Sequence, residues 1–379
     1  MYYHLRRTVF GVIFLCITVF VLVEFLLVDD LPLATPTYDA KHLKLLKDYK
    51  ARRTKKSRKV MVIGPTLYAT SNDIKIRGEV NIDQLNAVDI EAAVQLSGDN
   101  TSTSIDDLFI GVKSSGKFHK VRLPLLLDTW IPFARQATFL ITDVDDEEVK
   151  AEFEPDHYHV SRCSSSHHRV GLVCKVSVAY DLYILKPRRW FCMADDDTYI
   201  NIPNLVYTLA QYDHTKDWYI GKPSLKYPIR VNINNRKESF WFLTGGAGYC
   251  ISQSLALKMI PYARGGKLRE LANSIRIPDD VAVGYIINSI LAVDITRVPT
   301  FHSHLEGLWR ISPYQLKDQV TLSYGEFSSS GRRVTSNVVN TGGIIPTFPP
   351  PTDPTRLRSV HCYLYPNARE CSRFGIASL

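Results

Sequence analysis

Several common motifs are missing from the 379-residue sequence. It has no Cys-x2-Cys pair, which argues against a structural zinc site. Its glycine-rich turn, residues 244–248, matches neither a P-loop nor a dinucleotide-binding fingerprint. The net charge of +8 is concentrated in residues 1–59, where twelve basic and five acidic residues give +7. The remainder therefore carries about +1, which argues against a nucleic-acid-binding protein.

The sequence begins with a long apolar run, residues 8–28, in which Glu24 is the one charged residue. Such a run can cross a hydrocarbon core of roughly 30 Å as a helix. Arg6 and Arg7 precede it, which favours a cytoplasmic tail at residues 1–7, a transmembrane signal anchor and a lumenal remainder. The alternative is a cleaved secretory signal, although its apolar stretch is usually shorter and a small-residue cleavage site should follow. With either a signal anchor or a cleaved signal, the rest of the chain enters an oxidising compartment.

Cysteine usage agrees with an oxidising compartment. Cys16 lies inside the apolar run, and an even number of cysteines remains, as suits disulfides: Cys163, Cys174, Cys192, Cys250, Cys362 and Cys371. Six cysteines allow fifteen connectivities, so the sequence alone does not assign them. Proximity in sequence favours Cys163 with Cys174 and Cys362 with Cys371, which leaves Cys192 with Cys250. Asn100 begins the one N-glycosylation sequon.

The order of apolar runs predicts one folded domain. Residues 29–105 are polar and basic, so we interpret them as a lumenal stem, followed by a domain at residues 106–379. Strands and helices are expected to alternate at residues 107–113, 121–130, 137–142, 170–185 and 190–194. This alternation is typical of an α/β fold whose parallel sheet is covered by helices. We also expect a mobile loop at residues 327–351 and a compact piece at residues 357–374.

Three adjacent carboxylates, Asp195, Asp196 and Asp197, directly follow the last of these strands. Ligands of open α/β sheets bind at the carboxyl ends of strands, and oxygen ligands suit Mg²⁺ or Mn²⁺. Such an ion can neutralise the diphosphate of a departing nucleotide. The alternative is an ordinary solvated turn, but the apolar strand before the triplet favours a metal site.

A second carboxylate pair, Asp279 and Asp280, follows Pro278 at the head of a helical run at residues 281–291. A single-displacement transfer to a hydroxyl group needs one general base, and Asp280 is well situated for that role. The alternative is a helix N-cap, and both roles are compatible if Asp279 caps the helix. His304 is a candidate imidazole ligand, or else part of an exposed strand. Arg122 alone would be read as a surface charge.

Taken in order along the chain, these motifs resemble the Fringe glycosyltransferases. The resemblance covers residues 107–374, and the motifs that carry it include Trp190-Phe-Cys-Met-Ala-Asp-Asp-Asp197, Phe240-Trp-Phe-Leu-Thr-Gly-Gly-Ala-Gly248, Ile275-Arg-Ile-Pro-Asp-Asp280 and Phe301-His-Ser-His304. One departure adjoins the triplet, since Met193-Ala194 stands where vertebrate relatives usually carry His-Val.

The resemblance implies an activity. Fringe proteins are inverting β1,3-N-acetylglucosaminyltransferases of the Golgi membrane, single-pass type II, with a GT-A-type nucleotide-sugar-binding fold. That fold has a mostly parallel central sheet flanked by helices. The donor would be UDP-GlcNAc, the cofactor Mn²⁺, and the acceptor O-linked fucose on EGF-like repeats of Notch-type receptors, which modulates Notch signalling.

The resemblance also implies roles for individual residues. Asp197 and His304 would bind the metal, Arg122 and Asp196 would bind the donor substrate, and Asp280 would be the general base. The implied disulfides are Cys163–Cys174, Cys192–Cys250 and Cys362–Cys371.

Two other kinds of protein are alternatives. A β1,3-galactosyltransferase that builds mucin-type cores also carries an acidic triplet, and a membrane-tethered binding protein could keep the fold without turnover. A screen with UDP-GlcNAc and UDP-galactose as donors would separate all three.

Overall fold

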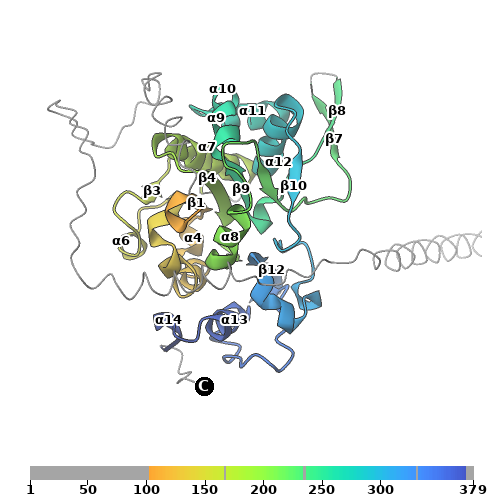
Figure 1. Ribbon diagram of the computed structural model, residues 1–379. Coiled ribbons are helices and arrows are strands. Elements are labelled where there is room, and N and C mark those ends of the chain that lie inside the picture. Colours follow the sequence, from red (N-terminus) through yellow and green to blue (C-terminus); the bar gives the residue numbers. More distant parts are fainter. Residues whose placement is uncertain (1–101, 166–167, 234–235, 330–331, 373–379) are drawn as a thin grey trace, which may run out of the picture. The chain divides into compact units, whose positions relative to one another are not determined.

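The computed structural model describes residues 102–372 except 166–167, 234–235 and 330–331 (Figure 1). The expected cytoplasmic tail, membrane anchor, Asn100 and nearly all of the expected stem lie outside the described residues. Across the part that is described, none of the helices is long and apolar enough to span a membrane.

Short strands and helices make up the described domain. The strands are β1 (Leu108–Lys113), β2 (Thr138–Thr142), β3 (Tyr158–Val160), β4 (Trp190–Asp195), β5 (Thr198–Ile200), β6 (Tyr219–Gly221), β7 (Ile229–Ile233), β8 (Arg236–Phe240), β9 (Tyr249–Ser252), β10 (Ile295–Arg297), β11 (Thr321–Ser323), β12 (Gly325–Ser329) and β13 (Arg332–Ser336). The α-helices are α4 (Gly116–His119), α5 (Leu123–Leu127), α6 (Glu147–Lys150), α7 (Arg169–Leu185), α8 (Ile202–Leu209), α9 (Gln253–Lys258), α10 (Ile260–Ala263), α11 (Lys267–Ile275), α12 (Asp279–Gly284), α13 (Leu357–Leu364) and α14 (Arg369–Ser372).

The central sheet is mixed and mostly parallel, as the sequence predicted. Its seven strands are ordered β10-β6-β9-β4-β1-β2-β3. β1 runs parallel to β2 and β4, whereas β9 is antiparallel to both of its neighbours, β4 and β6. The carboxyl ends of β1 and β4 therefore meet at one edge of the sheet, where Lys113 is the register partner of Asp195.

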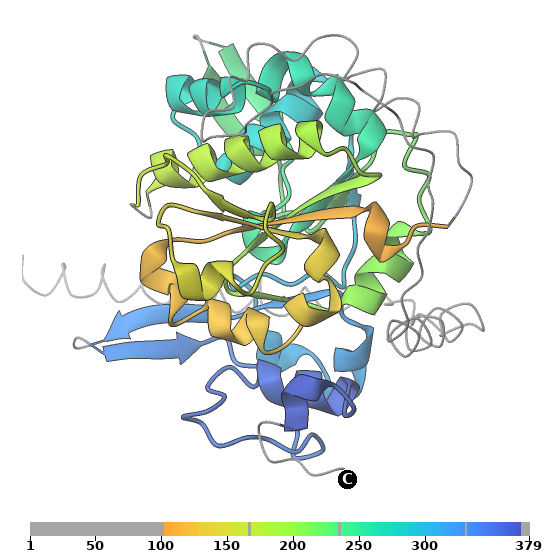
Figure 2. The ribbon, with the colours of Figure 1, turned by 90° about the vertical axis from the view of Figure 1, so that its left-hand side faces the viewer.

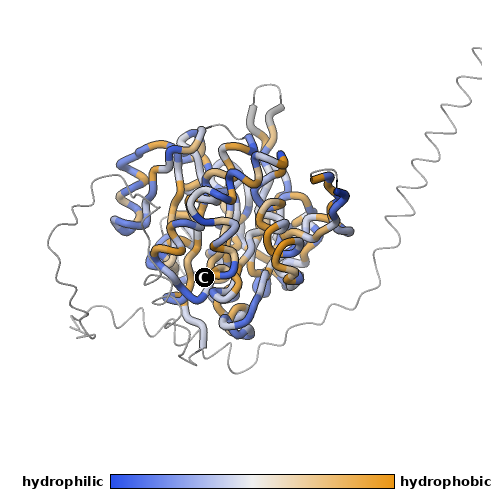
Figure 3. Tube along the Cα trace, turned by 90° about the horizontal axis from the view of Figure 1, so that it is seen from above, coloured by the Kyte–Doolittle hydropathy of each residue, from blue (hydrophilic) through white to orange (hydrophobic). Residues whose placement is uncertain are grey.

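Both faces of the sheet are buried, which explains why its central strands are apolar throughout rather than alternating. Leu108, Ile110 and Val112 of β1 pack into the core on one face, together with α5, α8 and α13. Phe109 points into the core on the other face, where its ring meets Tyr183 of α7, and residues of α9, α11 and α12 belong to the same core. Figure 2 shows the sheet nearly edge-on with α7 above it, and Figure 3 shows hydrophobic residues gathered along the inner strands and helix faces.

Three disulfides join the pairs that the resemblance implied. Cys163–Cys174 links the segment after β3 to α7, and Cys362–Cys371 joins α13 to α14 within the predicted compact C-terminal piece. Cys192–Cys250 crosses from β4 to β9 between residues that are direct register partners.

Two predicted elements differ from the structure. The helix expected at residues 121–130 is confined to Leu123–Leu127, and Arg122 precedes it as the N-cap residue. The expected loop at residues 327–351 begins instead with a β-hairpin, β12 and β13, whose strands pair from Gly325 with Ser336 to Ser329 with Arg332. Its Ser-rich composition resembles a loop, but backbone pairing across the hairpin outweighs that composition.

Candidate active site

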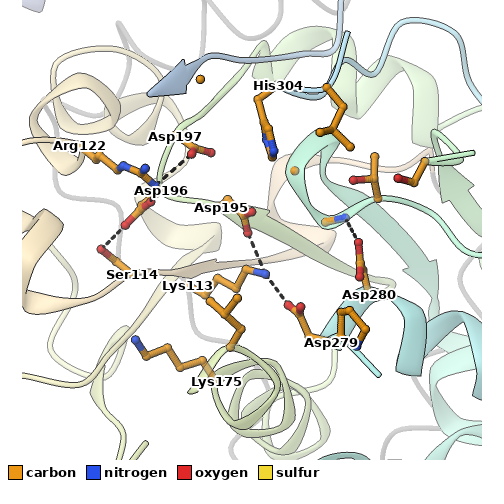
Figure 4. A pocket seen from close by; sticks show the side chains of 18 of the residues that line it. Lys113, Ser114, Arg122, Lys175, Asp195, Asp196, Asp197, Asp279, Asp280 and His304 are labelled. Carbon is orange, nitrogen blue, oxygen red and sulfur yellow. Dashed lines mark hydrogen bonds and ion pairs between the residues drawn. The ribbon is translucent and has the colours of Figure 1, made fainter. Parts of the chain in front are cut away.

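A cavity of about 570 Å³ opens where the carboxyl ends of β1 and β4 meet, and all five of the residues given chemical roles above line it: Arg122, Asp196, Asp197, Asp280 and His304. They come from segments far apart in the sequence, namely the turn between α4 and α5, the turn after β4, the head of α12 and the loop after β10. Figure 4 shows Arg122 and Asp197 on one side of the cavity, Asp279 and Asp280 on the other, and His304 between them.

The acidic triplet is mostly buried, so the alternative of a solvated turn is wrong. Asp195 ends β4, and Asp196 and Asp197 form the turn before β5. Asp196 is 4% exposed and Asp197 8% exposed. Ser114 Oγ donates a 2.7 Å hydrogen bond to Asp196, and Ser323 Oγ donates one of 3.2 Å to Asp197.

Arg122 binds the two buried carboxylates together. Its Nη1 lies 2.9 Å from Asp196 and 3.0 Å from Asp197, and its Nε lies 3.3 Å from Glu326 of β12. The guanidinium also lies over the Phe118 ring, 4.0 Å from its centroid. This planar group is therefore fixed in orientation, which a lysine at the same position would not achieve.

Arg122 does not fully offset the cost of charging the buried triplet. Burial, and next the charge of Asp195, raise the pKa of Asp197 to about 8 although Arg122 opposes them. Burial likewise raises the pKa of Asp196. A divalent cation beside Asp197 would relieve this repulsion, and carboxylate oxygens suit Mg²⁺ or Mn²⁺.

His304 reaches the cavity through a gap that glycine leaves. A Cβ added to Gly246 would lie 2.9 Å from both Nδ1 and Cε1 of His304, so a side chain there would displace the imidazole. The neighbouring His302 is buried and pairs with Gln319, with 2.8 Å between Nε2 and Oε1. Of the two histidines, His304 therefore faces the cavity.

The donor set fits a catalytic divalent ion rather than a closed structural site. Asp197 and His304 offer one carboxylate and one imidazole, and the described residues hold no group of three such side chains able to bind a metal. Catalytic Mg²⁺-type sites commonly use one or two carboxylates and leave the remaining positions to water and substrate phosphates.

Asp279 does not cap its helix, contrary to the expectation from sequence. Pro278 is the N-cap residue of α12, and Asp279 makes no capping hydrogen bond. Its carboxylate instead forms a buried ion pair with Lys113. Burial opposes the charge of Lys113, but Asp195 and Asp279 outweigh it and raise the pKa of Lys113 above its usual value.

Asp280 is turned toward the glycine-rich turn. Its Oδ2 accepts a 3.1 Å hydrogen bond from the Gly245 amide, and its Oδ1 accepts one of 2.8 Å from the Val281 amide. Burial, and then the charge of Asp279, raise the pKa of Asp280 to about 6, while Lys113 and these two amides hold it down. Asp280 is therefore mainly ionised at neutral pH but more basic than an ordinary aspartate.

Lys113 and Glu326 line the cavity although the sequence reasoning gave them no role. Lys113 could have been found, because a lysine that ends an apolar strand should lie at the same sheet edge as the triplet. Nothing in the sequence pointed to Glu326, which reaches Arg122 from 204 residues away. Met193, the departure noted beside the triplet, packs in the core against Gly111 and does not line the cavity.

Comparison with known proteins agrees with this arrangement. A family model described as Fringe-like matches residues 103–368. Beta-1,3-N-acetylglucosaminyltransferase lunatic fringe of Danio rerio is 48% identical over 273 residues, which is 71% of each chain. The lunatic fringe of Homo sapiens is 46% identical over 275 residues, 71% of this chain and 70% of its own. Radical fringe of Notophthalmus viridescens is 43% identical over 284 residues, 74% of this chain and 69% of its own. Together the family match and these relatives establish that the chain belongs to the Fringe family.

Proposed function

We propose that this protein transfers N-acetylglucosamine from UDP-GlcNAc in β1,3 linkage onto O-linked fucose of EGF-like repeats in Notch-type receptors. Relatives more than 40% identical are named beta-1,3-N-acetylglucosaminyltransferases, which supports this reaction. The observation that carries the proposal is one cavity lined both by a buried acidic triplet and by Asp280. We assign the α/β domain to the GT-A type and the full chain to the Golgi membrane, as a single-pass type II protein that modulates Notch signalling.

The reaction is a single displacement at the anomeric carbon of the donor. Asp280 accepts the proton of the fucose 3-hydroxyl while that oxygen bonds to the anomeric carbon and the bond to the UDP oxygen breaks. The α linkage of the donor thereby becomes a β linkage, and UDP leaves with the electron pair of the broken bond. One base suffices because no covalent intermediate forms.

Residues of the triplet side hold the donor in this proposal. Asp196 and Glu326 orient the guanidinium of Arg122, which then faces the negatively charged donor. Asp197 and His304 would hold Mn²⁺, which when bound supplies positive charge to the diphosphate. The Gly245 and Val281 amides aim the Asp280 carboxylate on the opposite side of the cavity.

A donor screen tests the reaction. Wild-type enzyme is given an O-fucosylated EGF-like repeat and either UDP-GlcNAc or UDP-galactose, with Mn²⁺. We expect transfer from UDP-GlcNAc; preference for UDP-galactose would favour the mucin-type galactosyltransferase, and no transfer from either would favour a binding protein.

The variant Asp280→Asn tests the base. It keeps the shape of the side chain and should still bind UDP-GlcNAc, while transfer falls by roughly 10²–10⁴-fold, the usual contribution of a general base. Near-normal turnover in Asp280→Asn together with loss in Asp279→Asn would show that the base is Asp279 instead.

A further inference from the structure

Two segments that line the cavity, one at Ser224 and the other at His304 and Leu305, also carry or adjoin apolar side chains that face solvent. Leu225, Tyr227, Leu305 and Trp309 are 45%, 78%, 66% and 59% exposed. We call these four residues the apolar rim. Leu225 follows Ser224, which lines the cavity, and Leu305 lines it directly. Tyrosine and tryptophan with large exposed surfaces are the residue types that most often anchor protein–protein contacts.

Both segments of the apolar rim are fastened to the turn that faces Asp280. The Lys222 carbonyl accepts a 2.9 Å hydrogen bond from the Thr244 amide, and the next amide, that of Gly245, donates to Asp280. On the other segment, His304 directly precedes Leu305, and its ring lies against Gly246. An ion pair between Lys222 and Glu306 ties the two segments together.

We propose that the apolar rim binds the polypeptide part of the acceptor glycoprotein, outside the sugar that enters the cavity. The inference rests on the proposed function, because it takes Asp280 as the base that meets the acceptor hydroxyl. An acceptor sugar that reaches Asp280 must have its attached protein at the mouth of the cavity on the side of the Gly245 turn. The apolar rim lies on segments that border the cavity, and burying its exposed apolar area against such a protein favours binding.

A second copy of this chain is a less suitable occupant of the same surface. A copy seated on Leu305 and its neighbours would cover the mouth through which the acceptor has to enter. The polypeptide of the acceptor covers the mouth only while its own sugar is inside the cavity. Binding at the apolar rim is therefore compatible with transfer.

The test compares one acceptor with a polypeptide and one without. The full chain in detergent is assayed with an O-fucosylated EGF-like repeat and, separately, with p-nitrophenyl α-fucoside. We expect Tyr227→Ala and Trp309→Ala each to raise KM for the repeat by roughly 5–30-fold, in the range of hot-spot truncations, with kcat little changed. KM for the small fucoside and for UDP-GlcNAc should stay at the wild-type value.

Tyr363→Ala is the matched control, since Tyr363 is a 48% exposed aromatic on α13 that does not line the cavity. It should change neither acceptor's KM. Equal losses on both acceptors by the rim variants, or no loss on the repeat, would overturn the proposal. So would a wild-type dimer that the rim variants convert to monomer, because the rim would then join two copies. If the wild-type chain glycosylates neither acceptor, the proposed function fails, and this inference with it.

Discussion

Replacing Lys113 with methionine should move the pH dependence of transfer toward alkaline pH. Lys113 Nζ lies 3.5 Å, and Asp280 Oδ2 4.0 Å, from the position that a Cβ on Gly245 would occupy, so the two atoms are at most 7.5 Å apart. At an effective dielectric constant of about 20, two unit charges at that separation interact by about 2 kcal/mol. Removing the ammonium should therefore raise the pKa of Asp280, about 6 in the wild type, by about 1.5.

The direction of the shift in the pH profile depends on which protonation state of Asp280 is active. The carboxylate takes the proton, so transfer is lost as the pH falls through the pKa of Asp280. We expect half-maximal kcat/KM near pH 6 for the wild type and near pH 7.5, to within about half a unit, for Lys113→Met. The assay is kcat/KM for the fucosylated repeat from pH 5 to pH 9.

Two further variants serve as controls for the charge effect. Lys113→Arg keeps a positive charge and should leave the acid limb near its wild-type position. Asp279→Asn removes a charge that raises the pKa of Asp280, so its limb should move toward acid pH. Losing one partner of a buried ion pair costs about 3–5 kcal/mol, so the folded fraction is measured by circular dichroism and rates are scaled to it. Coincident acid limbs for wild type and Lys113→Met would refute the reasoning.

Two other substitutions probe the glycine-rich turn and the disulfide beneath it. Gly246→Ala would bring a Cβ within 2.9 Å of the His304 ring, so we expect about tenfold more Mn²⁺ for half-maximal activity, as is usual when a ligand's support is disturbed. At Gly245 a Cβ meets nothing closer than 3.5 Å, so Gly245→Ala should keep the wild-type Mn²⁺ titration, and equal titrations for all three proteins would contradict the steric argument. Replacing Cys192 and Cys250 together with alanine opens a loop closed over a separation of 58 residues, which should lower the free energy of unfolding by about 4 kcal/mol in a urea titration; a loss below about 1 kcal/mol would count against an entropic role for this bond.

Sequence patterns predicted the sheet well because its strands are buried on both faces. A strand such as Leu108–Lys113 is then a continuous apolar run, and the expected boundaries of β1, β2, β4 and α7 agree with the structure to one residue. The acidic triplet was located for the same reason, since an apolar strand leads directly into it.

Other features depended on contacts between distant residues and had no local signal. Asp279 looked like a helix cap because capping is a local preference, but Lys113, 166 residues away, binds its carboxylate instead. The link from Arg122 to Glu326 has the same origin, because Glu326 lies on the β12–β13 hairpin, far from Arg122 in the sequence. The Ser-rich composition predicted a loop there, because composition does not report the backbone pairing that forms the hairpin.

The disulfide between β4 and β9 has a consequence for how the enzyme is produced. Cys192 lies three residues before Asp195, and Cys250 lies two residues after Gly248, so the bond ties the acidic turn to the glycine-rich turn. Thiols remain reduced in a bacterial cytosol, and in chain made there only non-covalent contacts hold these two turns together. Preparations from a secretory host and from a reducing host should therefore be compared for titratable thiols before any loss of turnover is credited to a substitution.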